Sequence, residues 1–140
     1  MSTHRLDWQD PRLDDFWGER RYASLTSLRR DGTPHTVPVA PVVDRAGRRL
    51  LVLASSTSQK VHNVESAGGD ARVSLCEIDG RHWVSVEGRA HVARDAATLA
   101  AAEELYAQRF RQPRANPERV IVVVEVDRLL GRLPDAPAQA

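Results

Sequence analysis

Short extended segments joined by tight turns are the feature that most restricts the fold of this chain. Asp31-Gly32 and Asp79-Gly80 each stand between two runs rich in β-branched and apolar residues. Asp-Gly in this position is typical of a two-residue hairpin turn, because glycine and aspartate tolerate the backbone angles that such turns need. The turns therefore predict neighbouring antiparallel strands with few long crossover connections.

Six segments have the composition of strands. Residues 49–55 are almost purely apolar, as in a strand buried on both faces, whereas residues 82–92 alternate in polarity. Residues 35–43 contain two prolines, which argues against a central strand and predicts that one edge faces something other than a strand. The six predicted strands cover residues 21–30, 35–43, 49–55, 71–78, 82–92 and 119–131.

Three helices are predicted, one before the strands and two between them. Asp10 is expected to cap the first, ahead of a proline that suits the first helical position. Asp95 is expected to cap the third, whose many alanines favour a helix. Phe16, Trp17 and Tyr22 are close in sequence and are expected to close one end of the core. The predicted helices cover residues 11–18, 59–67 and 96–110.

These elements predict one domain, a six-stranded antiparallel β-barrel with two to three short helices. We expect residues 10–133 to form it, with flexible termini at residues 1–9 and 134–140. A net charge of +1 gives no general attraction for nucleic acid, and no apolar run is long enough to span a bilayer. Because Cys76 is the single cysteine, we expect no disulfide and no multi-cysteine zinc site, and His62 and His91 have no partner at metal-ligand spacing, so we expect no metal site. No stretch resembles a signal peptide, so we expect a cytoplasmic location.

Residues 55–63, SSTSQKVHN, contain Lys60, the only lysine in the chain. Lys60 falls in the first turn of the predicted second helix, where free amides and the helix dipole attract anions. Ser58 or Thr57 is expected to cap this helix, and Asn63 lies one turn on from Lys60. The stretch is therefore a candidate phosphate site, although a capped surface helix with an isolated lysine explains the same residues.

A second group of cations lies in the segment QRFRQPRANPER, residues 108–119. Its guanidinium groups suit carboxylates, and the alternative is a solvated helix end where arginines complement the helix dipole. Phe110 is the single aromatic residue among them, too few for the stacking platform of a nucleic-acid site, so nucleic acid is a poor candidate ligand. The four arginines are Arg109, Arg111, Arg114 and Arg119.

Four segments, in this order, resemble the split β-barrel flavin and deazaflavin proteins of the pyridoxamine phosphate oxidase superfamily. They are DGTPHTVPV, SQKVHN, ARVSL and DGRHWVSVEGRA. Residues 104–131 further resemble the F420-dependent biliverdin reductases within that superfamily. The resemblance spans residues 13–131, and the order and spacing of the motifs are more specific than any one of them.

The resemblance implies a homodimer with the cofactor in a groove between the subunits. The start of the second helix would hold the cofactor phosphate, and the proline-bearing strand would lie along the ring system. The strand around Trp83 would line the groove, and His35 is a candidate near the ring, although a lone histidine is more often a turn residue. The implied phosphate ligands are Ser58, Gln59, Lys60 and Asn63, and the implied ring contacts are Val39, Ala40 and Pro41.

FMN and F420 both carry a ribityl phosphate, so the phosphate site does not distinguish them. F420 continues into a polyglutamate tail, which arginines such as Arg109 and Arg114 would bind, and this favours F420. We expect an F420H2-dependent reductase that transfers a hydride to a conjugated planar substrate, and the resemblance implies biliverdin as the specific candidate. The alternatives are an FMN-dependent oxidoreductase and a non-catalytic carrier of F420, flavin or tetrapyrrole. No catalytic side chain is assigned, because such cofactors carry the chemistry themselves.

Overall fold

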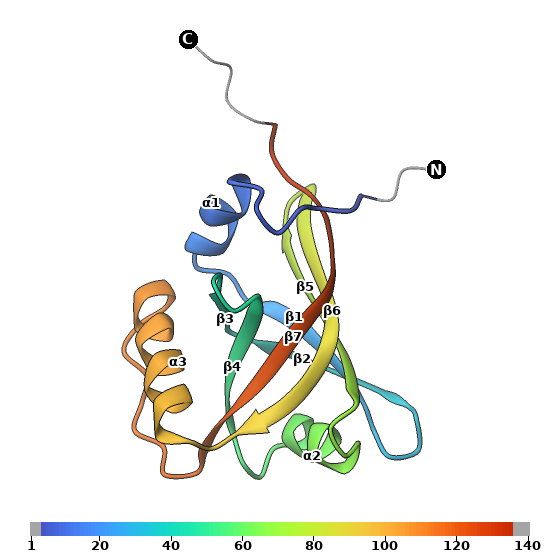
Figure 1. The fold of residues 1–140 in the computed structure, drawn as a ribbon, viewed down its shortest axis with the longest axis vertical. Coiled ribbons are helices and arrows are strands. Elements are labelled where there is room, and N and C mark those ends of the chain that lie inside the picture. Colours follow the sequence, from blue (N-terminus) through green and yellow to red (C-terminus); the bar gives the residue numbers. More distant parts are fainter. Residues whose placement is uncertain (1–3, 136–140) are drawn as a thin grey trace.

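Seven strands form one curled antiparallel sheet in the computed structural model, which describes residues 4–135 (Figure 1). The strands are β1 (Ala23–Leu28), β2 (Pro34–Val39), β3 (Pro41–Asp44), β4 (Arg49–Ser55), β5 (Ala71–Asp79), β6 (His82–Ala93) and β7 (Arg119–Arg132). The helices are α1 (Arg12–Gly18), α2 (Gln59–Ser66) and α3 (Ala96–Arg109). The order across the sheet is β2-β1-β5-β6-β7-β4-β3.

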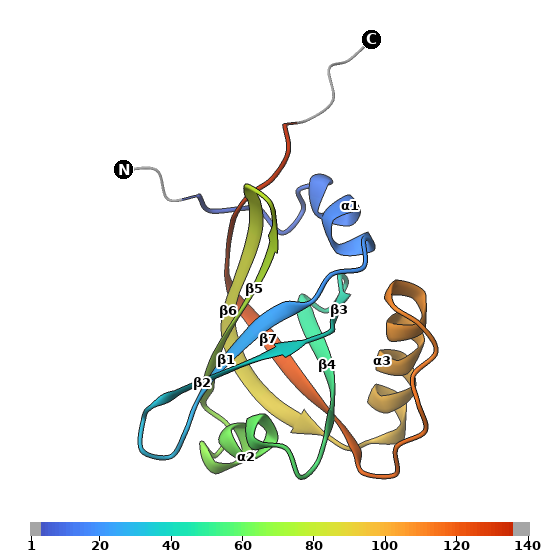
Figure 2. The ribbon, with the colours of Figure 1, turned by 180° about the vertical axis from the view of Figure 1, so that it is seen from behind.

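The strand expected at residues 35–43 is two strands, so the predicted number of six is wrong by one. β2 pairs with β1 at one edge of the sheet, and β3 pairs with β4 at the other. Only Ala40 separates them, and one residue spans at most about 3.6 Å. The two edges must therefore lie close together, which forces the sheet to curl into an open barrel (Figure 2).

Both predicted hairpins are confirmed, although residues 29–33 join β1 to β2 in place of the expected two-residue turn. Gly32 and Gly80 have φ angles of 86° and 61°, which favour glycine, and the strands that they join pair antiparallel. The alternation predicted for residues 82–92 is also confirmed, with a bulge between Glu87 and Gly88. A Cβ at Gly88 would lie 2.1 Å from the carbonyl oxygen of Glu125, so this position requires glycine.

Two apolar clusters hold the sheet and helices together. The larger fills the inside of the curled sheet, with α1 closing one end and α2 the other. Val61 and Val64 of α2 are buried in it, as are Phe16 and Trp17 of α1. The smaller cluster lies between α3 and the outer face of β3, β4 and β7. Tyr22 belongs to neither and is 63% exposed, so its expected place in the core is wrong.

The observed starts of the helices agree only in part with those predicted from the sequence. The carboxylate of Asp95 accepts a hydrogen bond from the Thr98 amide at 3.0 Å, which confirms the cap of α3. α1 begins one residue later than expected, and Asp10 accepts from the Arg12 amide at 3.0 Å. Ser58 occupies the cap position of α2, but its hydroxyl donates to the carbonyl of Ser55 and does not cap the helix.

Residues 4–9, expected to be flexible, pack against the barrel in the structure. The amide of Leu6 donates to the carbonyl of Leu129 at 2.9 Å, and Trp8 is buried. Residues 1–3 and 136–140, also expected to be flexible, lie outside the described residues. None of the helices within residues 4–135 has the length and apolar character needed to cross a membrane.

A buried ion pair fixes the place where the chain crosses between the sheet edges. Arg109, at the end of α3, donates to the carboxylate of Glu77 on β5, and both side chains are at most 5% exposed. Arg109 also donates to the carbonyl of Pro41 at 2.8 Å and to that of Glu19 at 2.9 Å. Burial raises the pKa of Glu77, against the opposing effect of the Arg109 charge. One guanidinium therefore joins α3, β5, the start of β3 and the segment after α1.

Arg109→Met is expected to lower the free energy of unfolding by about 3–5 kcal/mol, because it leaves the buried Glu77 carboxylate without its counter-charge. Urea denaturation followed by tryptophan fluorescence measures this loss. Arg94→Met is the matched control, since Arg94 pairs with Glu65 on the surface and should leave the midpoint almost unchanged. Equal midpoints for the two variants would contradict a structural role for the buried pair.

Candidate functional site

A groove of about 460 Å³ opens beside Ala40, at the split in the barrel. Its walls come from the ends of β2 and β4, the first turn of α2, and α3 with the loop that follows it. Within the described residues this lining contains four cations and no carboxylate. The polar lining residues are Ser55, Lys60, Arg111, Arg114, Asn116 and Arg119, and the others are Pro38, Val39, Ala40, Leu53, Ala54, Tyr106 and Pro113.

Lys60 is partly buried in this groove and lacks an ion-pair partner. Among residues 4–135 no carboxylate lies within 4.0 Å of its ammonium group. Burial lowers the pKa of Lys60, because it penalises the charged form of the amine. A bound anion would favour the charged form and offset this cost. The groove therefore presents a desolvated cation with no internal counter-charge.

The arginines in the lining differ in how they are held. Arg119 pairs with Glu103 at 2.6 Å and also donates to the carbonyl of Arg114, so its position is fixed by protein contacts. Arg111 and Arg114 are exposed, and neither guanidinium has a carboxylate within 4.0 Å among the described residues. Those two side chains are therefore free to meet an anionic ligand.

Two loops that are far apart in sequence are joined behind the groove. The backbone amide of Ser56 donates to the carbonyl of Glu118 at 2.8 Å, and its hydroxyl donates to the Glu118 carboxylate at 2.9 Å. The side-chain amide of Asn116 donates to the hydroxyl of Ser55 at 3.0 Å. These bonds hold the segment leading to Lys60 against the arginine-bearing loop. The sequence gives no signal for them, because about 60 residues separate the partners.

The structure brings only some of the expected binding residues together. Lys60, Val39, Ala40 and Arg114 line the groove. The other three implied phosphate ligands do not line it, because their polar groups bond within the protein. The Gln59 amide donates to Asn63 at 2.7 Å, the buried Asn63 amide donates to Ser27 at 2.9 Å, and Ser58 donates to Ser55.

Four further expected residues also lie outside the lining. Arg109 is buried and donates to Glu77 and to two backbone carbonyls, so its guanidinium is directed into the protein and away from the groove. Pro41 supplies one of these two carbonyls, and it directly follows Ala40, which lines the groove. His35 lies opposite Ser27 in the β1–β2 ladder, and Trp83 packs its ring edge-to-face on His4 with the centroids 5.9 Å apart.

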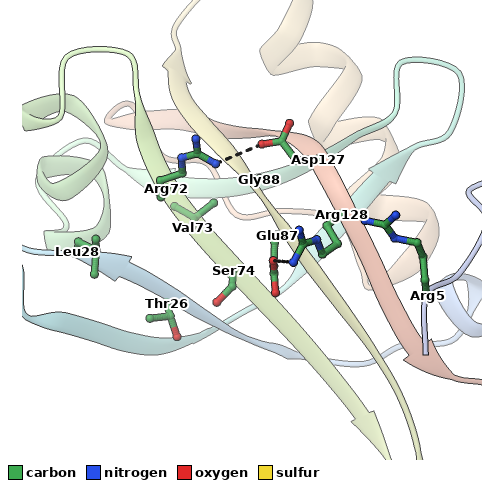
Figure 3. A pocket seen from close by; sticks show the side chains of 10 residues that line it. All are labelled: Arg5, Thr26, Leu28, Arg72, Val73, Ser74, Glu87, Gly88, Asp127 and Arg128. Carbon is green, nitrogen blue, oxygen red and sulfur yellow. Dashed lines mark ion pairs between the residues drawn. The ribbon is translucent and has the colours of Figure 1, made fainter. Parts of the chain in front are cut away.

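A second pocket, of about 490 Å³, lies on the outer face of β1, β5, β6 and β7 (Figure 3). Both carboxylates in its lining are paired with arginines of the same lining, and Arg5 is a further cation there. Arg72 lies 3.8 Å from Asp127, and Arg128 lies 3.7 Å from Glu87. An anion bound there would compete with these carboxylates, so the groove at Lys60 suits an anionic ligand better. Within residues 4–135, no three His, Cys, Asp or Glu side chains are grouped closely enough to hold a metal ion.

Comparisons with known proteins agree on the fold and on the family. Residues 9–132 match the family model described as pyridoxamine 5'-phosphate oxidase. The chain is 41% identical over 116 residues to the F420H(2)-dependent biliverdin reductase of Mycobacterium tuberculosis (strain CDC 1551 / Oshkosh), covering 83% of this chain and 82% of that protein.

Two solved structures share the fold. Rv2991 of Mycobacterium tuberculosis, a conserved hypothetical protein, has a TM-score of 0.76 at 20% identity and covers 100% of this chain and 97% of its own. A structure described as an F420 reductase has a TM-score of 0.64 at 24% identity, with 83% of this chain and 94% of its own covered.

The pKa of Lys60 is expected to lie below the ordinary value for lysine and to rise when inorganic phosphate is added. Burial lowers this pKa, whereas an anion beside the amine raises it. NMR of protein labelled with 13C-lysine measures it without ambiguity, because the chain has one lysine. Chloride at equal ionic strength is the control. A pKa at the ordinary value, or one that phosphate and chloride change equally, would exclude an anion site at Lys60.

Proposed function

This chain belongs to the pyridoxamine 5'-phosphate oxidase family, and from that premise we propose that it is an F420-dependent reductase whose cofactor lies in the groove around Lys60. The relative with 41% identity supports this choice of cofactor, because its name states that it uses F420H2. The observation that carries the placement is the partly buried Lys60, which has no counter-charge from residues 4–135 and lies in a groove whose described lining contains no carboxylate. A carboxylate in that lining would repel the phosphate that every candidate cofactor carries.

The chemistry of the groove fits an elongated anionic cofactor. Lys60 and the first-turn amides of α2 would hold the phosphate, since both favour negative charge at that position. Val39 and Ala40 form a wall without ionisable side chains, along which a ring system would lie. When bound in reduced form, F420 supplies a hydride for the reaction. The chain's own residues hold the reactants in place and neutralise the cofactor's negative charge.

Arg114 favours F420 over FMN. It is exposed at the edge of the groove, where a tail of carboxylates could reach it, and FMN has no such tail. Guanidinium groups bind carboxylates in a planar, two-point geometry that lysine does not offer. An FMN-dependent oxidoreductase would leave Arg114 without a carboxylate tail to bind. For the substrate we propose a conjugated planar molecule, with biliverdin as the specific candidate from the 41% identical relative.

Lys60→Ala is expected to weaken the binding of F420 and of FMN alike, by roughly 1.5–3 kcal/mol, because both carry the phosphate. Arg114→Ala should weaken F420 binding and leave FMN binding unchanged. Calorimetric titration of the wild type and both variants with each cofactor measures this pattern. Turnover of biliverdin with reduced F420 then separates an enzyme from a carrier.

Lys60→Arg is the matched control, because it keeps the charge and should keep most of the affinity. If the wild-type protein binds FMN more tightly than F420, the alternative of an FMN-dependent oxidoreductase would replace the proposed function. Wild-type protein that binds neither cofactor would contradict the proposed function altogether.

We further propose that the chain is a homodimer through the outer face of β1, β5, β6 and β7, part of which Figure 3 shows. Leu28 and Ile78 are large apolar side chains exposed on this face, at 47% and 67%. Exposed apolar groups of this kind are typical of protein–protein contacts. The face also carries arginines beside carboxylates, which a second copy could pair across the interface.

Sedimentation equilibrium is expected to give twice the chain mass of 15.6 kDa. Ser74→Arg, in the middle of the proposed face, should shift the protein toward monomer, because it places a bulky charge in the contact. Ala100→Arg, on the exposed side of α3, is the control and should leave the mass unchanged. A monomeric wild type, or a dimer that Ser74→Arg does not affect, would contradict this interface.

A further inference from the structure

Three aromatic rings form a stack that runs from the groove to the surface. The rings of Tyr106 and Phe110 have centroids 5.2 Å apart, and those of Phe110 and Tyr22 are 6.0 Å apart. The Tyr22 and Phe110 planes differ by only 11°, so these two rings lie almost parallel. One end of the stack, Tyr106, lines the groove, and the other end, Tyr22, is 63% exposed.

The position of Tyr22 places it beside the wall proposed for the cofactor ring. Ala23 pairs with Val39 in the β1–β2 ladder, so Tyr22 lies one residue beyond that pair, next to Ala40. Phe110 stands in sequence between Arg109, which is buried, and Arg111, which lines the groove. The stack is thus anchored in the fold through Phe110 and is continuous with the groove.

The exposure of Tyr22 is not explained by the core or by the proposed dimer face. The other large exposed apolar side chains, Leu28 and Ile78, lie on the outer face of the sheet, whereas Tyr22 packs on Phe110. One face of the Tyr22 ring is covered by Phe110, and most of the rest is open to solvent. An open aromatic face held parallel to a fixed ring is suited to stacking a further flat, conjugated molecule.

We propose that Tyr22, supported by Phe110, is the stacking platform for the planar substrate. This inference rests on the proposed function, since it places the substrate at the edge of the groove near Ala40, against the cofactor ring. Lys60 and Arg114 would then serve the cofactor, while Tyr22 serves the second reactant. Tyr22 would thereby select flat conjugated substrates over flexible saturated ones of similar size.

The test is a titration with biliverdin, followed by its visible absorbance, which needs no turnover. Tyr22→Ala is expected to weaken biliverdin binding about threefold to tenfold, the range for one aromatic contact, without changing the F420 affinity. Tyr22→Phe should bind like the wild type, and Tyr22→Leu, which keeps apolar area without a ring, should bind like Tyr22→Ala. Ala100→Ser, on the exposed side of α3 and away from the proposed dimer face, is the control and should change neither affinity.

The outcomes separate this inference from the proposed function. Equal biliverdin affinity in the wild type and Tyr22→Ala would overturn the platform, even if F420 binds as proposed. A parallel loss of F420 affinity in Tyr22→Ala would also overturn it, because Tyr22 would then serve the cofactor. Titration of the wild-type protein with F420 tests the proposed function separately. If the wild type fails to bind F420, the proposed function is overturned. Sedimentation of Tyr22→Ala checks that the assembly is unchanged.

Discussion

The passage of the chain across the split in the barrel, within the single residue Ala40, governs the rest of the structure. It forces the two edges of a seven-stranded sheet together, and Arg109 secures the junction by binding the carbonyl of Pro41 and the carboxylate of Glu77. Burying two charges is expensive unless both are paired and hydrogen-bonded, a condition that this arrangement meets. The groove begins at the same residue, so Ala40 both connects the two edges of the sheet and forms part of the wall against which a ligand would lie.

The arginines and the lysine near this junction divide into two kinds. Arg109 and Arg119 have carboxylate partners and determine where α3 and its following loop lie. Lys60 and Arg114 have none among the described residues, and both line the groove. A positively charged side chain therefore stabilises the fold where a carboxylate pairs with it, and it is available to bind a ligand where no carboxylate does. This difference supports a cofactor with a phosphate at one end and carboxylates beyond it.

Local signals in the sequence were sufficient for most of the fold. The Asp-Gly turns, the alternation of residues 82–92 and the cap at Asp95 depend on neighbours along the chain, and all were predicted. Contacts between residues far apart in the sequence were not predicted. The partners of Arg109 lie up to 90 residues away in the sequence. The residues near Arg109 and Arg114 therefore gave no signal that the first would be buried and the second exposed. Lys60 stood out because it is the only lysine, but Asn63, one turn on, turned out to bond to Ser27 on β1. Tyr22 was misplaced because proximity in sequence to Phe16 does not fix the direction of a side chain.

A barrel that stays split keeps room for a ligand but leaves two strand edges without partners. Such edges are templates on which another chain can add a strand, and they are a common origin of aggregation. β2 carries Pro34 and Pro38, and β3 begins with Pro41. Proline has no N–H to offer an incoming strand, so each one interrupts the ladder that an intruding chain would need. The residues beside the open groove therefore also protect the protein from edge-to-edge self-association.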